Sequence, residues 1–223
     1  MQPVDRPGLA WFAMVLAGLI APAGAMFLLV DATNSGLLPR FGGPVLAVGL
    51  MGAGMIGAAA AGRLWVGVLL AVVAGASLIM LGSVLGTPTL PDPLASGLAI
   101  GIASISFAAR GALFARSATS RGWWIALAVV AGEAAIVLTA LADPGLWPDW
   151  LLVLLPAQWA STAIQTSLAG AGTFAASSAL IALGGTALAT LLVARLWPRR
   201  WPYLIMFTTW LALSALVYHR PAP

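Results

Sequence analysis

Glu133 is the residue whose position in this sequence most strongly suggests chemistry. It lies in the middle of the apolar stretch 129–143, VVAGEAAIVLTALAD, ten residues after Trp123. On a helix this spacing places the carboxyl about 15 Å from the helix end, close to the middle of a bilayer. An ionisable side chain at that depth costs about 2.5–3.5 kcal/mol on insertion scales and by default marks a functional site. We therefore expect Glu133 to face neighbouring helices rather than lipid.

Arg110 and Ser104 are the side chains best placed to meet this carboxyl. The apolar stretch 94–115 is joined to 123–141 by a short basic loop, so an antiparallel helix pair is expected. Counted from the middle of the loop, Ser104 lies at the same depth as Glu133, and Arg110 lies about 9 Å nearer to the loop. Arg110 either extends toward Glu133 or turns its guanidinium to the lipid headgroups.

Two roles are open for Glu133. In the functional role it binds a proton or a cation in turn, and its charge state is coupled to a movement. In the structural role a protonated or paired carboxyl holds the helices 94–115 and 123–141 together. No second acid lies inside an apolar stretch to relay protons, which weighs against the functional role.

The segment 150–170, WLLVLLPAQWASTAIQTSLAG, changes character at Pro156 from apolar to polar. Gln158 and Gln165 are seven residues apart and share one face of a helix. Polar backbone at membrane depth persists only where it is buried in protein or lines a cavity. The segment is therefore either a substrate-facing half-helix broken at Pro156 or an interfacial helix with its polar side in water, and we favour the interfacial form.

The composition predicts that lipid surrounds the whole chain. Of the 223 residues 61% are hydrophobic and 7% are charged, against about 25% charged in soluble domains. The mean hydropathy is +1.03, and apolar runs long enough to cross a bilayer recur. The fold class is therefore all-α, one polytopic membrane bundle over residues 1–223. We expect helices at about 8–30, 45–62, 64–85, 94–115, 123–141, 173–194 and 203–218.

Arginines decide the topology, because short cytoplasmic loops of membrane proteins are enriched in Lys and Arg. If 150–170 enters and returns, or lies at the interface, the basic loops share one side of the membrane: Arg63, Arg116, Arg121, Arg195, Arg199 and Arg200. If it crosses, the last three lie outside. We expect seven transmembrane helices plus one re-entrant or interfacial segment and a cytoplasmic N-terminus; the alternative is eight transmembrane helices. The Arg, Ala and Gly content is typical of a GC-rich bacterium, so we expect a bacterial inner membrane.

Several kinds of chemistry are excluded by absent residue types. The chain has no cysteine, no lysine and a single histidine, His219, near the C-terminus. Disulfides, thiolate metal centres, histidine-ligated haem and a retinal Schiff base are therefore not expected. We expect no cofactor and no catalytic residues, and an enzyme acting on lipid is the least favoured function. The basic pI reflects topology rather than nucleic-acid binding.

Two weaker patterns concern packing and an N-terminal loop. Small residues recur at every fourth position, which lets helices pack closely within the bundle or between copies: Gly49, Ala53, Gly57 and Ala61. The predicted loop 31–44 holds residues that could cradle a headgroup or anion, although turn formation explains them as well: Asp31, Thr33, Asn34, Arg40, Gly42 and Gly43.

Two functions are compatible with these features. The first is a secondary transporter or channel in which Glu133 couples ion movement, and in which Arg110, Ser104, Gln158 and Gln165 are the other candidate site residues. The second is a non-catalytic subunit or assembly factor of a larger membrane complex, supported by the short loops and the small-residue faces. The expected partners are the lipid bilayer and, in the second case, other membrane proteins or further copies of the chain.

Overall fold

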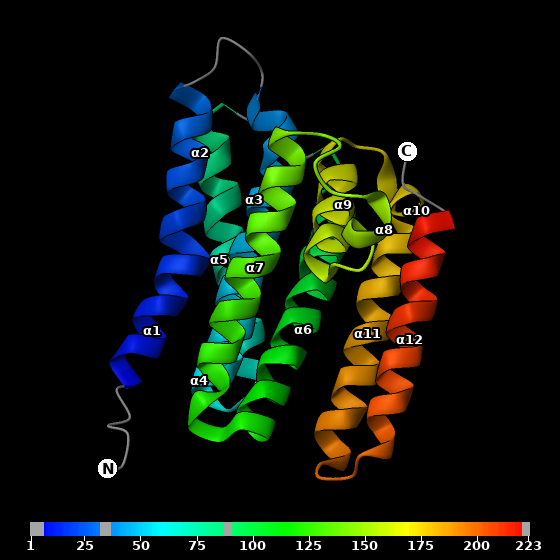
Figure 1. Ribbon diagram of the computed structural model, residues 1–223. Coiled ribbons are helices and arrows are strands. Elements are labelled where there is room, and N and C mark those ends of the chain that lie inside the picture. Colours follow the sequence, from blue (N-terminus) through cyan, green and yellow to red (C-terminus); the bar gives the residue numbers. More distant parts are fainter. Residues whose placement is uncertain (1–6, 32–36, 87–90, 220–223) are drawn as a thin grey trace.

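The computed structural model describes residues 7–31, 37–86 and 91–219, and within these ranges every regular element is helical. Helical rods make up the first half of the described chain (Figure 1). The first rod consists of α1 (Pro7–Val15), the π-helical η1 (Leu16–Ile20) and α2 (Ala21–Asp31). The second consists of α3 (Leu37–Met51), the π-helical η2 (Gly52–Ile56) and α4 (Gly57–Ala61), and the third is α5 (Leu64–Val84).

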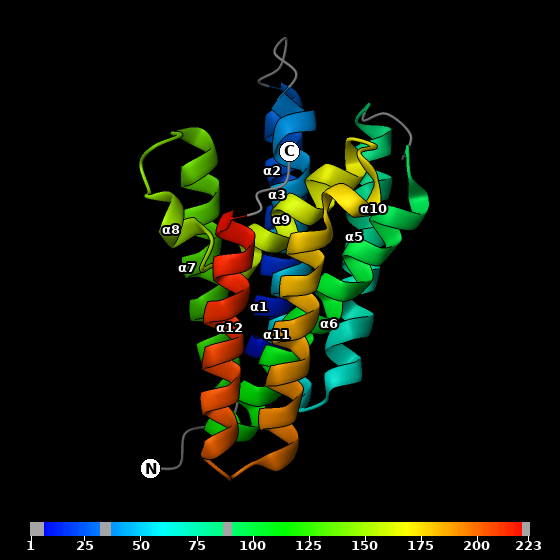
Figure 2. The ribbon, with the colours of Figure 1, turned by 90° about the vertical axis from the view of Figure 1, so that its right-hand side faces the viewer.

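The second half contains four long helices and a group of short ones. Helix α6 (Pro93–Ala118) turns through the 3₁₀ segment η3 (Thr119–Arg121) into the antiparallel α7 (Gly122–Ala142). The last two helices are α11 (Ser177–Leu196) and α12 (Trp201–His219), which stand side by side in Figure 2. Between α7 and α11 lie α8 (Asp149–Leu152), α9 (Pro156–Leu168) and α10 (Gly172–Ala175).

Length and apolar composition identify this as a membrane-type helical fold, as the sequence predicts. Among the described residues six helical stretches are long and apolar enough to cross a membrane: Gly8–Val30, Phe41–Ala61, Leu64–Val84, Pro93–Ala142, Ser177–Leu196 and Trp201–His219. The fourth stretch has 50 residues and folds back on itself at η3, as Figure 1 shows.

Apart from Arg110 and Glu133, most of the described charged residues are sorted between the two ends of the bundle. The connections α4–α5, α6–α7 and α11–α12 all lie at the lower end in Figure 1. We call this the arginine end, because these connections and the helix ends beside them carry Arg63, Arg116, Arg121, Arg195, Arg199 and Arg200. The opposite, aspartate end carries Asp92, Asp143 and Asp149, together with Arg40 in the first turn of α3. At the arginine end, Nη1 of Arg116 donates to the carbonyl of Ala194 near the end of α11.

The rod α3–η2–α4 forms the centre of the bundle. In its most apolar stretch of 18 residues, 83% are buried. Its small residues permit close contacts inside the molecule. A Cβ on Gly49 would lie 2.5 Å from Cδ1 of Leu78, and one on Gly57 would lie 2.6 Å from Cδ1 of Leu70. The small-residue pattern is therefore used within the bundle. Lipid supplies no hydrophobic drive between helices, so such close approach is a main source of their association.

The segment from α8 to α10 enters the bundle and returns to the same end. It starts after α7 at the aspartate end, and α11 starts again from that end (Figure 1). Nine of the 13 residues of α9 are buried, so α9 does not expose a polar face to water as the favoured interfacial form requires. This path is compatible with the re-entrant alternative. Burial is the physical reason, because α9 packs against α3, α6 and α11.

The turn expected at Gly42–Pro44 is also wrong, because α3 already begins at Leu37 and Pro44 lies inside it. Gly42 and Gly43 are buried in this helix and do not form a loop cradle. A Cβ on Gly43 would lie 2.8 Å from Cβ of Gln165, so packing of α9 against α3 overrides the local turn preference. Thr33 and Asn34 lie outside the described residues.

The re-entrant path can be tested with single cysteines, since the natural chain has none. Leu146 and Ala171 are exposed at opposite ends of the segment, and Ser120 is exposed at the arginine end. In oriented vesicles we expect a membrane-impermeant maleimide to label L146C and A171C from one side and S120C from the other. Labelling of L146C and A171C from opposite sides would show that the segment crosses the membrane.

Close packing in the core can be tested at Gly111 of α6. A Cβ there would lie 2.1 Å from the carbonyl oxygen of Met55, whereas Gly101 on the same helix has nothing within 4 Å. We expect G111A to destabilise the bundle by about 1–3 kcal/mol through overpacking, measured by thermal unfolding in detergent. The matched control G101A should be neutral or stabilising, and equal stability of the two variants would contradict this packing.

Candidate functional site

The site is built around the first turn of α9, which begins in the interior of the bundle. Pro156 occupies the first turn of this helix, a position where its missing N–H costs nothing. Glu133 lies near the middle of α7 and faces this turn. Its Oε2 accepts a hydrogen bond of 2.9 Å from the backbone N–H of Ala157. A carboxylate at this position is stabilised by the unpaired N–H groups and the positive end of the helix dipole.

Two backbone carbonyls that precede α9 accept hydrogen bonds from indoles. Nε1 of Trp159 donates to the carbonyl of Val153 at 2.8 Å. Nε1 of Trp210, the middle residue of α12, donates to the carbonyl of Leu154 at 3.1 Å. The carbonyl of Leu155 accepts from the next turn of α9. Broken backbone at this depth is tolerated only with such partners, because lipid supplies none.

Arg110 of α6 is the second charged residue of the site. Its Nη2 donates to Oγ of Ser106 at 3.3 Å, and its guanidinium carbon lies 5.6 Å from the centre of the Phe107 ring. Its Nη1 is buried and has no hydrogen-bond partner among the described residues. Arg110 interacts electrostatically with Glu133, although no direct ion pair between them occurs in the described structure. Its side chain does not extend to the headgroups, because its charged end is enclosed.

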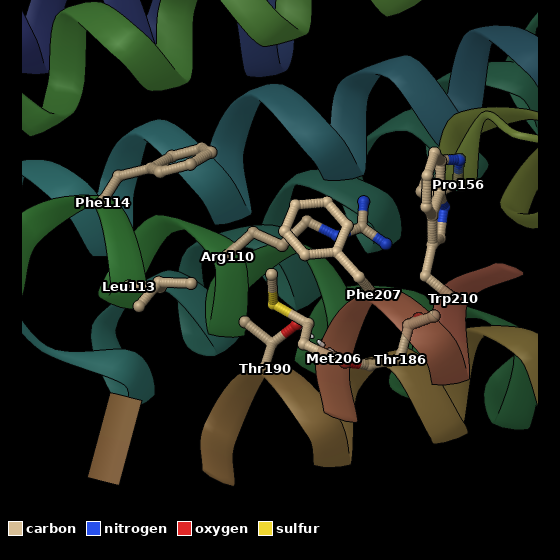
Figure 3. A pocket seen from close by; sticks show the side chains of 9 residues that line it. All are labelled: Arg110, Leu113, Phe114, Pro156, Thr186, Thr190, Met206, Phe207 and Trp210. Atoms are coloured by element: carbon tan, nitrogen blue, oxygen red, sulfur yellow. Dashed lines mark hydrogen bonds between the residues drawn. The ribbon is translucent and has the colours of Figure 1, made fainter. Parts of the chain in front are cut away.

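A cavity of about 160 Å³ adjoins Arg110 between α6, α9, α11 and α12. Figure 3 shows the guanidinium directed toward Pro156 and Trp210, with the ring of Phe207 beside it. The cavity is lined by Arg110, Leu113, Phe114, Pro156, Thr186, Thr190, Met206, Phe207 and Trp210. Pro156 joins it to the Glu133 contact, because the next residue, Ala157, makes that hydrogen bond.

The other three candidate residues are placed differently. Oε1 of Gln165 accepts a hydrogen bond of 3.0 Å from the backbone N–H of Gly43 and so links α9 to α3. Gln158 is half-buried, and its side chain makes no hydrogen bond within the described part of the chain. Ser104 is fully buried, and its hydroxyl has no partner among the residues described. The structure therefore unites Glu133 and Arg110 around α9 and assigns Gln165 to a helix contact.

Sequence reasoning missed the partner of Glu133, which is a backbone N–H and not a side chain. It also missed Trp159 and Trp210. The signal for these two was available, because most tryptophans lie near predicted helix ends whereas Trp159 and Trp210 do not. An indole inside the bundle needs an acceptor for its N–H, and the broken segment supplies it.

The described residues contain no group of three or more His, Cys, Asp or Glu side chains that could hold a metal ion. The ionisable groups at this site are the carboxyl of Glu133 and the guanidinium of Arg110. Comparison with protein-family models, curated proteins and solved structures found no match.

The hydrogen bond of Glu133 can be separated from its charge by two substitutions. In E133Q the amide oxygen still accepts from Ala157, so we expect near-normal folding. In E133L the buried N–H loses its acceptor, which costs about 1–3 kcal/mol. Thermal unfolding in detergent measures the difference, with D143L as the control at an exposed acid of the same helix region. An E133L protein as stable as E133Q would show that this bond does not fix α9.

Proposed function

We propose that the protein is a bacterial inner-membrane protein with seven crossings, one re-entrant segment and a cytoplasmic N-terminus. The seven crossings are the six apolar stretches, with Pro93–Ala142 counted twice because it turns back at η3. The sorting of six described arginines to one end supports this orientation, since basic loops remain in the cytoplasm. The re-entrant segment then opens toward the periplasmic side.

Within that frame the protein is a secondary transporter in which Glu133 is the ion-coupling residue. The observation that carries this proposal is the meeting of Glu133, Arg110 and the broken start of α9 in the bundle interior. Discontinuous helices whose ends point at charged groups near the midplane form the binding sites of many transporters. The cavity at Arg110 supplies space for a solute beside this charged centre.

Protonation or cation binding at Glu133 provides the coupling. The ionised carboxylate holds the N–H of Ala157 and balances Arg110. When its charge is neutralised, both interactions weaken, and the first turn of α9 is less firmly held. The chain before α9 is irregular between Val153 and Leu155, so this turn can shift without breaking a long helix. A shift of the turn would alter the wall of the cavity at Pro156.

A second candidate is a non-catalytic subunit of a larger membrane complex. Three hydrogen bonds favour it, because a fixed support for α9 needs these same bonds. They join Glu133 to Ala157, Trp159 to Val153 and Trp210 to Leu154. In that case E133Q changes neither folding nor function, and the chain purifies with stoichiometric partners after gentle extraction.

Solute-evoked currents on a supported membrane distinguish the two candidates. We expect a panel of amino acids, sugars, small organic anions and cations to include at least one solute that evokes a current with the wild-type protein. E133Q should abolish this current while folding normally. The control D143N, an equivalent change of an exposed acid, should retain it. A current in E133Q equal to that of the wild type would eliminate Glu133 as the coupling residue.

A further inference from the structure

The cavity at Arg110 combines one buried cation with apolar and aromatic walls. We infer that it is a binding site for a small aromatic carboxylate. This inference deepens the proposed transport function by naming a substrate class, and it rests on that function only for the movement of the ligand across the membrane. Binding itself follows from the size, charge and walls of the cavity.

The size of the cavity fits a single aromatic ring. Its volume is about 160 Å³, and an engineered apolar cavity of about 150 Å³ binds benzene. Phe114, Phe207 and Trp210 offer ring contacts, which favour an aromatic ligand beyond simple burial. The thioether of Met206 also interacts favourably with an aromatic ring.

The charge of the cavity fits a monoanion. Arg110 is the only charged residue in the lining, and its Nη1 is buried with no partner among the described residues. An unpaired buried donor is costly, and a carboxylate is the group that a guanidinium binds with the best geometry. The threonine hydroxyls of the wall already donate to their own helix, Thr186 to Ala182 at 2.8 Å and Thr190 to Thr186 at 2.7 Å. These hydroxyls therefore have no free proton to donate to a sugar or a doubly charged phosphate.

Glu133 connects ligand binding with protonation. With Glu133 ionised, the charge of Arg110 is already balanced, and a second anion in this apolar region is unfavourable. With Glu133 protonated, Arg110 is free to bind the ligand carboxylate. Few other ionisable groups lie on the elements packed against α7. Besides Arg110, they are Arg116 on α6, Arg121 on η3 and Arg40 on α3. The elements α1, η2, α4 and α9 carry none. Arg116 and Arg121 lie at the arginine end, and Arg40 lies at the opposite end.

The test is equilibrium binding of radiolabelled benzoate to the full-length protein in lipid nanodiscs, with empty nanodiscs as background. We expect saturable binding that strengthens as the pH falls, within the range in which benzoate stays ionised. R110Q should weaken binding at least about tenfold, whereas R121Q, a matched change at an exposed arginine, should not. E133Q should bind about tenfold or more tightly than the wild type at high pH and lose the pH dependence.

A cavity-filling variant keeps the test valid if R110Q folds poorly. T190L adds volume inside the cavity and leaves both charged residues intact, so it should abolish binding. T208L makes the same change on the exposed face of α12 and should retain binding. Absence of saturable binding, or binding that survives both R110Q and T190L, would overturn the inference. Benzoate binding without any solute-evoked current would support this site and contradict transport. A Glu133-dependent current without benzoate binding would support transport and contradict this site.

Discussion

The hydrogen bond between Glu133 and the N–H of Ala157 is the interaction on which the interior of this bundle depends. A helix that starts inside an apolar bundle exposes N–H groups that neither lipid nor a neighbouring turn can satisfy. Pro156 removes one of these groups, and Glu133 accepts from the next. The carbonyls before the break are paired with two indoles. The contacts of Glu133, Trp159 and Trp210 thus meet one requirement, that the backbone groups exposed where α9 begins find partners inside the bundle.

The proposed coupling role of Glu133 rests on the same contact that supports α9. A carboxylate that caps a helix stabilises it more when it is ionised than when it is protonated. Any ligand that changes the charge of Glu133 therefore changes the stability of the first turn of α9. Arg110 of α6 interacts electrostatically with this carboxyl. In the proposed function this contact acts as a switch because the carboxyl of Glu133 is ionisable. A ligand anion would compete with that carboxyl for the charge of Arg110.

Much of the fold follows from the sequence, because the lengths of the apolar segments and the positions of the arginines can be read from it directly. The membrane-type helices, the α6–α7 hairpin and the contact of Glu133 with a neighbouring helix could all be predicted in this way. The path of 150–170 depends on tertiary burial, so the sequence alone is compatible with re-entrant, interfacial and crossing forms. The start of α3 before Pro44 was missed, since close packing at Gly43 overrides turn preference. The partner of Glu133 could not be predicted, because a backbone N–H leaves no mark in the sequence.

Glu133 is the only glutamate in the chain, so selective ¹³C labelling of glutamate gives a single carboxyl signal. Solid-state NMR of the labelled protein in bilayers, with ¹⁵N at alanine, would follow this signal and the Ala157 amide together as the pH changes. The account predicts that the carboxyl signal titrates and that the Ala157 amide signal shifts with it, as the hydrogen bond weakens. A carboxyl signal that stays constant over the whole range in which the protein remains folded would contradict the coupling role and leave Glu133 as a fixed support for α9.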